Sequence, residues 1–365
     1  MTWNFKEELQ KQVLILDGAM GTMVQSLSLD DRAFGGAEFK MLTDLLIFSR
    51  PDDLKEIHHK YFRAGAHMVE TDTFGASPLR LREFDFRNID PAGLQAIPAG
   101  LDLRGNDTAS ICLHLNREGA RIARRAAEDY RASAEYDGRP LFIAGSIGPS
   151  NYVLSSTEAN LKRATFAQVV DNFRLQVKGL VEGGVDVLLF ETQQDILETK
   201  AAIVGARRAF EETGTTLPII AQVTVDAFSK MQIFNTDIHA AYTAVAGMGI
   251  DVFGINCNVG PELMQATVEK LAQFSRHPVS IVPNAGQPLS EDGCTVYKLE
   301  PGPMADHLER FVHDHGVSIV GGCCGTTPAH IEAVARRLKG AVPSRRHLPE
   351  RVFLSGPQEA VPLDS

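Results

Sequence analysis

Eight short apolar segments, each followed by helical periodicity, are the feature of this sequence that most limits its fold. They are rich in Val, Ile and Leu and alternate little between apolar and polar residues, as expected of parallel strands buried on both faces. The segments lie at 13–17, 67–71, 141–145, 186–191, 218–224, 252–256, 279–284 and 317–322. Eight strand–helix units over about 330 residues are typical of a (β/α)8 TIM barrel.

A doubly wound open sheet is the alternative fold, because it also alternates strands and helices. The first segment is not followed by a G-x-G-x-x-G motif, which weakens that alternative. We therefore predict a single-domain barrel over residues 1–340 and an extended tail over 341–365. The connection after the second strand, residues 84–115, has no clear period, and we expect a lid or docking surface beside the barrel mouth or else a plain surface excursion.

Composition limits the function classes. The 365 residues carry a formal net charge of −10, which argues against a nucleic-acid surface and favours a small-molecule substrate. No apolar run approaches the ~18 residues of a membrane helix, and the N-terminus lacks the apolar core of a secretion signal. Five cysteines, an odd number, indicate reduced thiols. We expect a cytoplasmic protein that binds neither nucleic acid nor membrane.

Three cysteines directly follow predicted strands. Cys257 follows the sixth strand in GINCNVGP, and Cys323 and Cys324 follow the eighth in VGGCCGTTP. The carboxyl ends of barrel strands share one rim, so these thiols should meet there, whereas Cys112 and Cys294 are expected in loops. Three thiolates suit Zn²⁺ with one position left open, which makes them candidate zinc ligands and catalytic residues. The alternative is that they are small buried residues.

The chemistry of such a zinc site indicates the reaction. With three thiolates it carries a net charge of about −1, so it generates hydroxide poorly but still binds a further thiol as thiolate. A free thiol is mostly protonated at neutral pH and therefore a weak nucleophile. The predicted reaction is transfer of an alkyl group to a thiol activated by the zinc.

Further groups at strand ends suit a thiol that carries an amino acid. Asp17 ends the first strand in LILDGAMGT and Glu191 ends the fourth in LLFETQQD, where each could bind an ammonium group or merely cap a helix. Backbone amides of the following turn, residues 18–22, could hold a carboxylate. The candidates in that turn are Gly18, Ala19, Met20 and Gly21. Homocysteine would satisfy both ends.

Seven motifs, in order, give the chain a recognisable pattern. They are DGAMGT, ETDTFGAS, GSIGPS, LLFETQQDILETKAA, GINCNVGPE, PNAGQP and GGCCGTTP. Over residues 13 to about 340 the chain resembles the homocysteine S-methyltransferase family, and within it the homocysteine-binding module of cobalamin-dependent methionine synthases. The tail at 347–359 also resembles the segment by which that module runs on into its folate-binding neighbour.

The resemblance implies zinc on the three cysteines, Asp17 and Glu191 at the substrate amino group, and Asn284 near the metal. It implies methyl transfer to homocysteine, giving methionine. Because the sequence ends before any folate- or cobalamin-binding domain, we expect the donor to be methylcobalamin on a separate corrinoid protein, as in a divided methionine synthase.

Two departures from the family pattern keep other functions open. The loop VDAFSKMQIFN (225–235) differs from the Ser/Thr/Gly-rich loop usual after the fifth strand, and the stretch 85–112 is longer than expected. One alternative is a methyltransferase that uses a small donor such as S-methylmethionine or betaine. Another is a zinc- and thiol-binding module that has lost catalysis.

Overall fold

The main sheet of the computed structural model is a barrel of eight parallel strands. The structure describes residues 3–363 except 156–160, 292–293 and 349. The barrel strands are β1 (Leu14–Ile15), β2 (Met68–Glu70), β3 (Phe142–Ile147), β4 (Val187–Gln193), β5 (Ile219–Val223), β6 (Val252–Asn256), β7 (Val279–Val282) and β10 (Ile319–Val320). They are ordered β1-β10-β7-β6-β5-β4-β3-β2, and a parallel bridge between Leu16 and Met68 joins the two edges. The predicted fold is confirmed.

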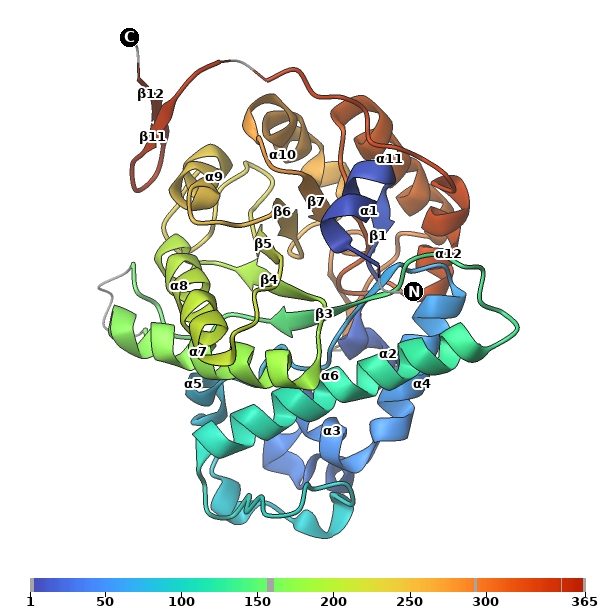
Figure 1. The fold of residues 1–365 in the computed structure, drawn as a ribbon, viewed down its shortest axis with the longest axis vertical. Coiled ribbons are helices and arrows are strands. Elements are labelled where there is room, and N and C mark those ends of the chain that lie inside the picture. Colours follow the sequence, from blue (N-terminus) through green and yellow to red (C-terminus); the bar gives the residue numbers. More distant parts are fainter. Residues whose placement is uncertain (1–2, 156–160, 292–293, 349, 364–365) are drawn as a thin grey trace.

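Helices surround this barrel (Figure 1). The long ones are α4 (Pro51–Arg63), α6 (Thr108–Ala132), α7 (Phe166–Gly183), α8 (Ile196–Thr213), α9 (Ile238–Ala246), α10 (Pro261–Phe274), α11 (Pro301–His315) and α12 (Pro328–Arg337). Shorter α-helices are α1 (Phe5–Lys11), α2 (Met20–Ser26), α3 (Leu46–Ser49) and α5 (Pro78–Leu81). No helix in the described part of the chain is long and apolar enough to cross a membrane.

Proline and glycine mark several helix ends. Proline occupies the first turn of α4, α10, α11 and α12. An N–H at that position has no partner within the helix, so its absence in proline costs no helical hydrogen bond. Gly184, Gly214 and Gly316 end α7, α8 and α11 with φ of 87°, 66° and 66°, a left-handed conformation that costs glycine little. Each glycine turns the chain back toward its next strand.

The barrel interior is an apolar cluster built from alternate strand positions. Strand side chains alternate between the two faces of a sheet, so residues two apart share the interior. Examples are the pairs Leu14 and Leu16, Phe142 and Ala144, and Val187 and Leu189. Helix α1 closes the amino end of this interior, because its Phe5 and Leu9 belong to the same cluster. The Phe5 ring meets Phe142 edge-on, with 5.6 Å between ring centroids.

The connection after β2 differs from the prediction. It contains 3-10 helices at Phe86–Asn88 and Pro91–Gly93, and α6 begins at Thr108, so residues 108–115 are helical. Cys112 is therefore a buried helical residue rather than a loop residue. Cys294 also lies outside a loop, in the strand β9 (Cys294–Val296), which pairs with β8 (Leu289–Glu291).

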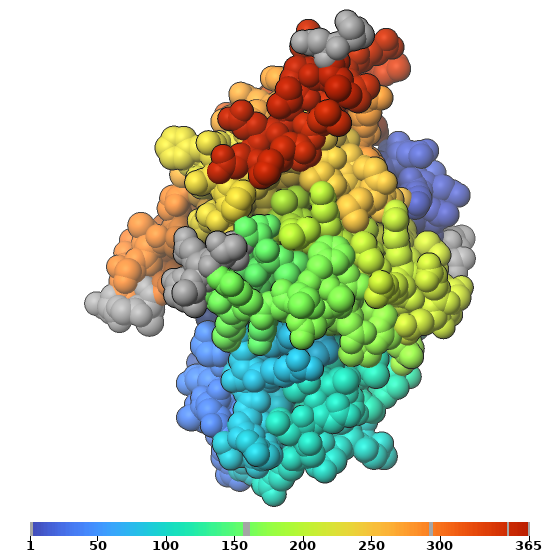
Figure 2. Space-filling model, turned by 90° about the vertical axis from the view of Figure 1, so that its left-hand side faces the viewer, coloured from blue at the N-terminus to red at the C-terminus, as the bar shows by residue number. Residues whose placement is uncertain are grey.

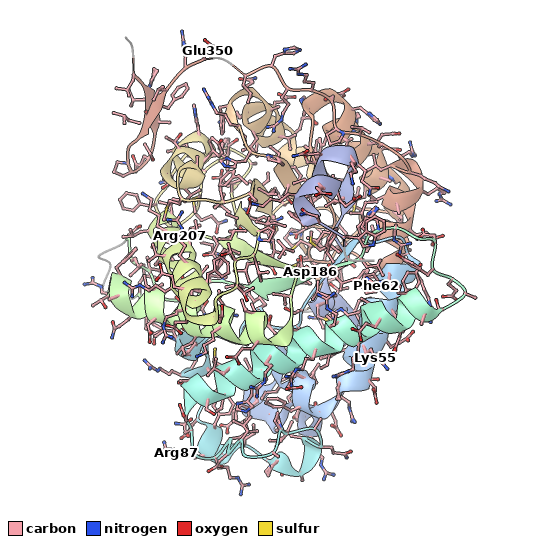
Figure 3. The ribbon with its side chains drawn as sticks, viewed as in Figure 1. Lys55, Phe62, Arg87, Asp186, Arg207 and Glu350 are labelled. Atoms are coloured by element: carbon pink, nitrogen blue, oxygen red, sulfur yellow. The ribbon has the colours of Figure 1, made fainter. Side chains whose placement is uncertain are left out.

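This connection packs on the segment after β1, which holds 3-10 helices at Asp31–Phe34, Ala37–Phe39 and Thr43–Leu45. The Phe86 ring lies 5.5 Å from that of Phe39, and the Asp90 amide donates to the Gly35 carbonyl at 2.8 Å. Figure 3 labels Arg87 here, at the opposite end of the molecule from Glu350 in the tail. The connection after β2 is thus packed against the segment after β1. Its expected role as a lid or docking surface stays a prediction.

The tail crosses the outside of the barrel and ends in a hairpin that the sequence did not predict. Strands β11 (Phe353–Ser355) and β12 (Ala360–Pro362) pair in antiparallel fashion. Residues 349, 364 and 365 of the predicted tail lie outside the described residues. Figure 2 shows the tail lying on the surface over the region of α9. The Ser355 hydroxyl donates to the Ala240 carbonyl of α9 at 2.9 Å, which holds the hairpin in place.

A buried acid holds the loop that follows β3. Glu198, on α8, accepts hydrogen bonds from the Ser150 amide at 2.7 Å and from the Ser150 hydroxyl at 2.5 Å. Burial raises the pKa of Glu198 to about 7, although the bonds from Ser150 lower it. An acid whose pKa is higher in the folded than in the unfolded chain loses stabilising free energy as pH rises between the two values.

We predict that Glu198→Gln removes this pH dependence. Wild type should lose about 3 kcal/mol at this site between pH 4.5 and pH 7, because each pKa unit corresponds to about 1.4 kcal/mol. The glutamine oxygen can still accept from Ser150 and does not titrate. Urea unfolding of both proteins at pH 5 and pH 8 tests this. If wild type and Glu198→Gln differed in unfolding free energy by the same amount at both pH values, the prediction would be contradicted.

Candidate metal centre

Three cysteine sulfurs converge at the carboxyl ends of the strands. The Sγ atoms of Cys257, Cys323 and Cys324 all lie within 4.8 Å of one another, and those of Cys257 and Cys324 are 3.9 Å apart. Within the described part of the chain, no other set of three or more His, Cys, Asp or Glu side chains is grouped closely enough to hold a metal ion. The structure therefore brings together the three thiols that the sequence singled out.

The turn after β7 aligns the two adjacent cysteines. The Cys323 amide donates to the Pro283 carbonyl at 2.8 Å, and the Ala285 amide donates to the Cys324 carbonyl at 2.9 Å. These two bonds attach the turn after β10 to the turn after β7. Adjacent sulfurs on an extended chain would point apart, so this attachment is needed to direct both toward one point.

Backbone strain positions the third sulfur. Cys257 has φ of 63° and Asn258 has φ of 68°, a left-handed region that residues other than glycine rarely adopt. Such conformations cost about 1–3 kcal/mol each and persist only where the surrounding structure enforces them. Here the Cys257 amide donates to Val282 of β7 at 3.1 Å. Strained residues concentrate at functional sites, and the strain at Cys257 is consistent with a functional role for this residue.

The cluster is an electron-rich donor set. Hydrogen bonds from the thiols of Cys257 and Cys323 lower the pKa of Cys324 to about 3, with a further bond from Tyr297. The same contacts raise the pKa of Cys323 well above its usual range. Three sulfurs this close cannot all be charged without a cation between them. Soft thiolates in this number fit Zn²⁺.

The sulfurs lie on the wall of a cavity of about 790 Å³. Glu70, Asp72 and Glu191 also line it, and no lysine, arginine or histidine does among the described residues. The remaining lining residues are Ala19, Met20, Gly21, Thr22, Gln25, Thr43, Thr71, Phe74, Ser146, Thr192, Val282, Thr295, Tyr297 and Gly322. A small-molecule site commonly has 300–1,000 Å³. The surplus of carboxyl groups suits a cationic ligand.

Glu191 lies within β4 and reaches the cavity. Its carboxylate accepts from the Ser146 hydroxyl at 2.5 Å and from the Asn256 amide group at 3.3 Å. Burial raises the pKa of Glu191 to about 7, while the bond from Ser146 lowers it. A carboxyl group with this pKa becomes charged near neutral pH and can then bind an ammonium group.

The other residues predicted from the sequence lie close to the cavity. Ala19, Met20 and Gly21 are on its wall, whereas Asp17, Gly18 and Asn284 are not among its lining residues.

Asp17 accepts from the Glu70 amide through both oxygens, at 3.2 and 3.1 Å. Burial raises its pKa well above the usual range, and nearby Glu191 adds to that shift. Asn284 is buried in the turn that aligns the cysteines, and its side-chain oxygen has no hydrogen-bond partner among the described residues.

Sequence reasoning missed three cavity residues. Glu70 ends β2 and Asp72 lies two residues beyond it, in the motif ETDTFGAS, so the strand-end rule that selected Asp17 could also have found them. Burial, then the charges of Glu191 and Asp17, raises the pKa of Glu70 well above its usual range. Tyr297 follows β9 in a hairpin with no strand-end signal, and nothing in the sequence marked it.

The unusual loop after β5 leaves the cavity unchanged. None of residues 225–235 lines it. Within the loop, Asp226 accepts from the amides of Phe228 and Lys230 at 2.8 and 3.0 Å, and the Phe228 ring is 78% exposed. This departure from the family pattern therefore does not change the wall around the cysteines.

We predict that Cys257→Ala, Cys323→Ala and Cys324→Ala each abolish stoichiometric zinc binding. Each removes one of three converging thiolates, and the remaining pair cannot complete the site. Cys112→Ala is the control, since Cys112 is buried in α6 and should leave zinc content intact. Metal analysis with circular dichroism measures both. The zinc-free protein should remain folded on its large core. Full zinc retention in Cys257→Ala or Cys324→Ala would show that these thiols are only core residues.

Comparison with known proteins places the chain in a family. Methionine synthase from Mycobacterium tuberculosis is 35% identical over 357 residues, which are 97% of this chain and 27% of that protein. Methionine synthase from Mycobacterium leprae is 36% identical over 364 residues, covering 98% of this chain and 27% of that protein. The chain thus spans just over a quarter of the length of these relatives.

A solved structure shares the fold. The metallated form of the homocysteine methyltransferase MmuM from Escherichia coli matches with a TM-score of 0.67 at 23% identity, covering 90% of this chain and 97% of that one. The sequence model of homocysteine S-methyltransferases matches residues 14–338. These findings confirm the predicted methyltransferase assignment: the chain belongs to the homocysteine S-methyltransferase family.

Proposed function

We propose that this chain transfers a methyl group to the sulfur of homocysteine, giving methionine, with zinc held by Cys257, Cys323 and Cys324. The observation that carries the proposal is the convergence of three sulfurs on the wall of an acidic, ligand-sized cavity. Bound zinc would supply a cation that keeps a thiol deprotonated at neutral pH. The substrate sulfur forms a bond to the methyl carbon as the donor's own bond to that carbon breaks, and the thiol proton is released.

The chain's own residues would bind the amino-acid end of the substrate. Glu191 would accept hydrogen bonds from the ammonium group, with the buried carboxyl groups of Asp17 and Glu70 close to it. Helix α2 begins at Met20 without a side-chain cap, so its first-turn amides could donate hydrogen bonds to the substrate carboxylate. Asn284, beside the cysteine turn, would support the metal when no substrate is bound.

The donor we favour is a methylated corrinoid on a separate protein. Support comes from the relatives, which are methionine synthases nearly four times as long as the segment they share with this chain. A small cationic donor, such as a sulfonium or betaine, is the second candidate. The acidic cavity, which has no basic lining residue in the described part of the chain, favours it, since such a wall attracts a cation.

A donor panel should separate these functions. We expect the zinc-loaded protein to form methionine from homocysteine with methylcobalamin, free or on a corrinoid protein, and mass spectrometry of the product measures this. Turnover with S-methylmethionine or betaine but none with methylcobalamin would overturn the preferred donor. Zinc and homocysteine binding without turnover from any donor would identify a binding module instead.

We predict that Glu191→Gln weakens homocysteine binding by about tenfold to a hundredfold at pH 8, because a hydrogen bond to a charged group contributes about 1.5–3 kcal/mol. In wild type, affinity should fall as pH drops below about 7, where Glu191 becomes protonated, and this dependence should be smaller in the variant. Isothermal titration calorimetry on zinc-loaded protein measures both.

Glu198→Gln is the matched control, since Glu198 is also a buried acid with a pKa of about 7 but does not line the cavity. It should leave the dissociation constant unchanged. Equal affinities in wild type and Glu191→Gln would exclude Glu191 from the ammonium site.

A further inference from the structure

Tyr297 reaches the cysteine cluster from outside the barrel strands. It directly follows β9, in a hairpin with β8 that projects from the body at the left of Figure 2. Thr295 and Tyr297 both line the cavity, because residues two apart in a strand face the same side. Tyr297 and Cys324 line the same cavity, and a hydrogen bond from Tyr297 contributes to lowering the pKa of Cys324.

A glycine admits the tyrosine to this position. Gly325 has φ of 79°, and a Cβ atom built on it would lie 2.4 Å from both Cβ and Cγ of Tyr297. No side chain could occupy that space without displacing the ring. The glycine after the cysteine pair therefore serves two purposes: it permits the turn, and it lets the phenol approach Cys324.

The main chain beyond Tyr297 is fixed at two points. The Leu299 amide donates to the Ala285 carbonyl at 3.0 Å, in the turn that also binds the cysteine pair. The Leu299 carbonyl faces Nε2 of His330 at 2.8 Å, while Nδ1 of His330 accepts from the Thr327 amide at 3.2 Å. Nε2 therefore carries the proton and donates to Leu299. These bonds hold Tyr297 at the cluster although its hairpin is exposed.

We propose that Tyr297 is a positioning residue of the metal centre, whose phenolic O–H donates a hydrogen bond to Sγ of Cys324 and draws negative charge away from that ligand. The proposal rests on the metal site of the proposed function. Three thiolates and a substrate thiolate around one divalent cation carry excess negative charge. A donor outside the ligand set stabilises that charge and orients the ligand, as partners of metal ligands generally do.

The test compares Tyr297→Phe with wild type, using Co²⁺ as a spectroscopic probe of the cysteine ligands. Loss of the hydrogen bond raises the energy of the sulfur lone pair, so the sulfur-to-cobalt charge-transfer band should move to longer wavelength with its intensity retained. Zinc affinity, measured by chelator competition, should fall about tenfold, at the low end of the range for such partners. Thr295→Val, which removes a hydroxyl from the same strand face, should change neither.

The outcomes are distinguishable. An unshifted band and unchanged zinc affinity in Tyr297→Phe would overturn the proposal, as would the same shift in Thr295→Val. Circular dichroism confirms that each variant is folded, and Tyr297→Phe keeps the ring that packs on Gly325. If wild type itself shows no sulfur-to-cobalt band, the metal site of the proposed function fails, which is a different result from loss of the tyrosine effect alone.

Discussion

The hydrogen bonds around the end of β7 are the constraint on which the cysteine cluster depends. Strands β6 and β10 are not neighbours but flank β7, so their ends are about 10 Å apart, twice the spacing between strands. The sulfurs of Cys257 and Cys324 are nevertheless 3.9 Å apart. Both turns must lean across the end of β7, and the backbone bonds to Val282, Pro283 and Ala285 hold them there. Left-handed backbone at Cys257 is the cost of this geometry.

The electrostatics of the cavity follow from what its wall lacks. Glu70 and Glu191 are buried together without a basic residue among the lining side chains, so each raises the cost of charging the other. Burial alone would keep such carboxyl groups neutral. A ligand ammonium group reverses this balance, because it supplies the countercharge that the chain does not. The proposed binding of a substrate ammonium group would thus gain from relief of this carboxyl repulsion as much as from direct attraction to the ligand.

The barrel could be predicted from its eight apolar strand segments, and the cysteine cluster from the residues that directly follow those strands. Once eight buried parallel strands are recognised, residues after them share one rim, and Cys257, Cys323 and Cys324 fall there without further information. Tyr297 could not be found in this way, since it enters from a hairpin whose strand β8 is exposed at all three residues and shows no apolar pattern. The irregular connection predicted over 84–115 overlaps the first turns of α6, because Pro, Gly and Asp before Thr108 hide where helical periodicity begins. The cysteine cluster was predictable because the closed barrel brings the strand ends to one rim. Tyr297 and the start of α6 were not, because local packing determines their positions.

The helix that closes the amino end of the barrel has a kinetic consequence. Phe5 and Leu9 fill that end, whereas the cysteine-lined cavity lies at the carboxyl ends of the strands. Under the proposed function, both reactants would reach the sulfurs from that rim. The thiol substrate would lie deeper and bind first, with the methyl donor arriving above it. An excess of the donor would then obstruct entry of the thiol substrate.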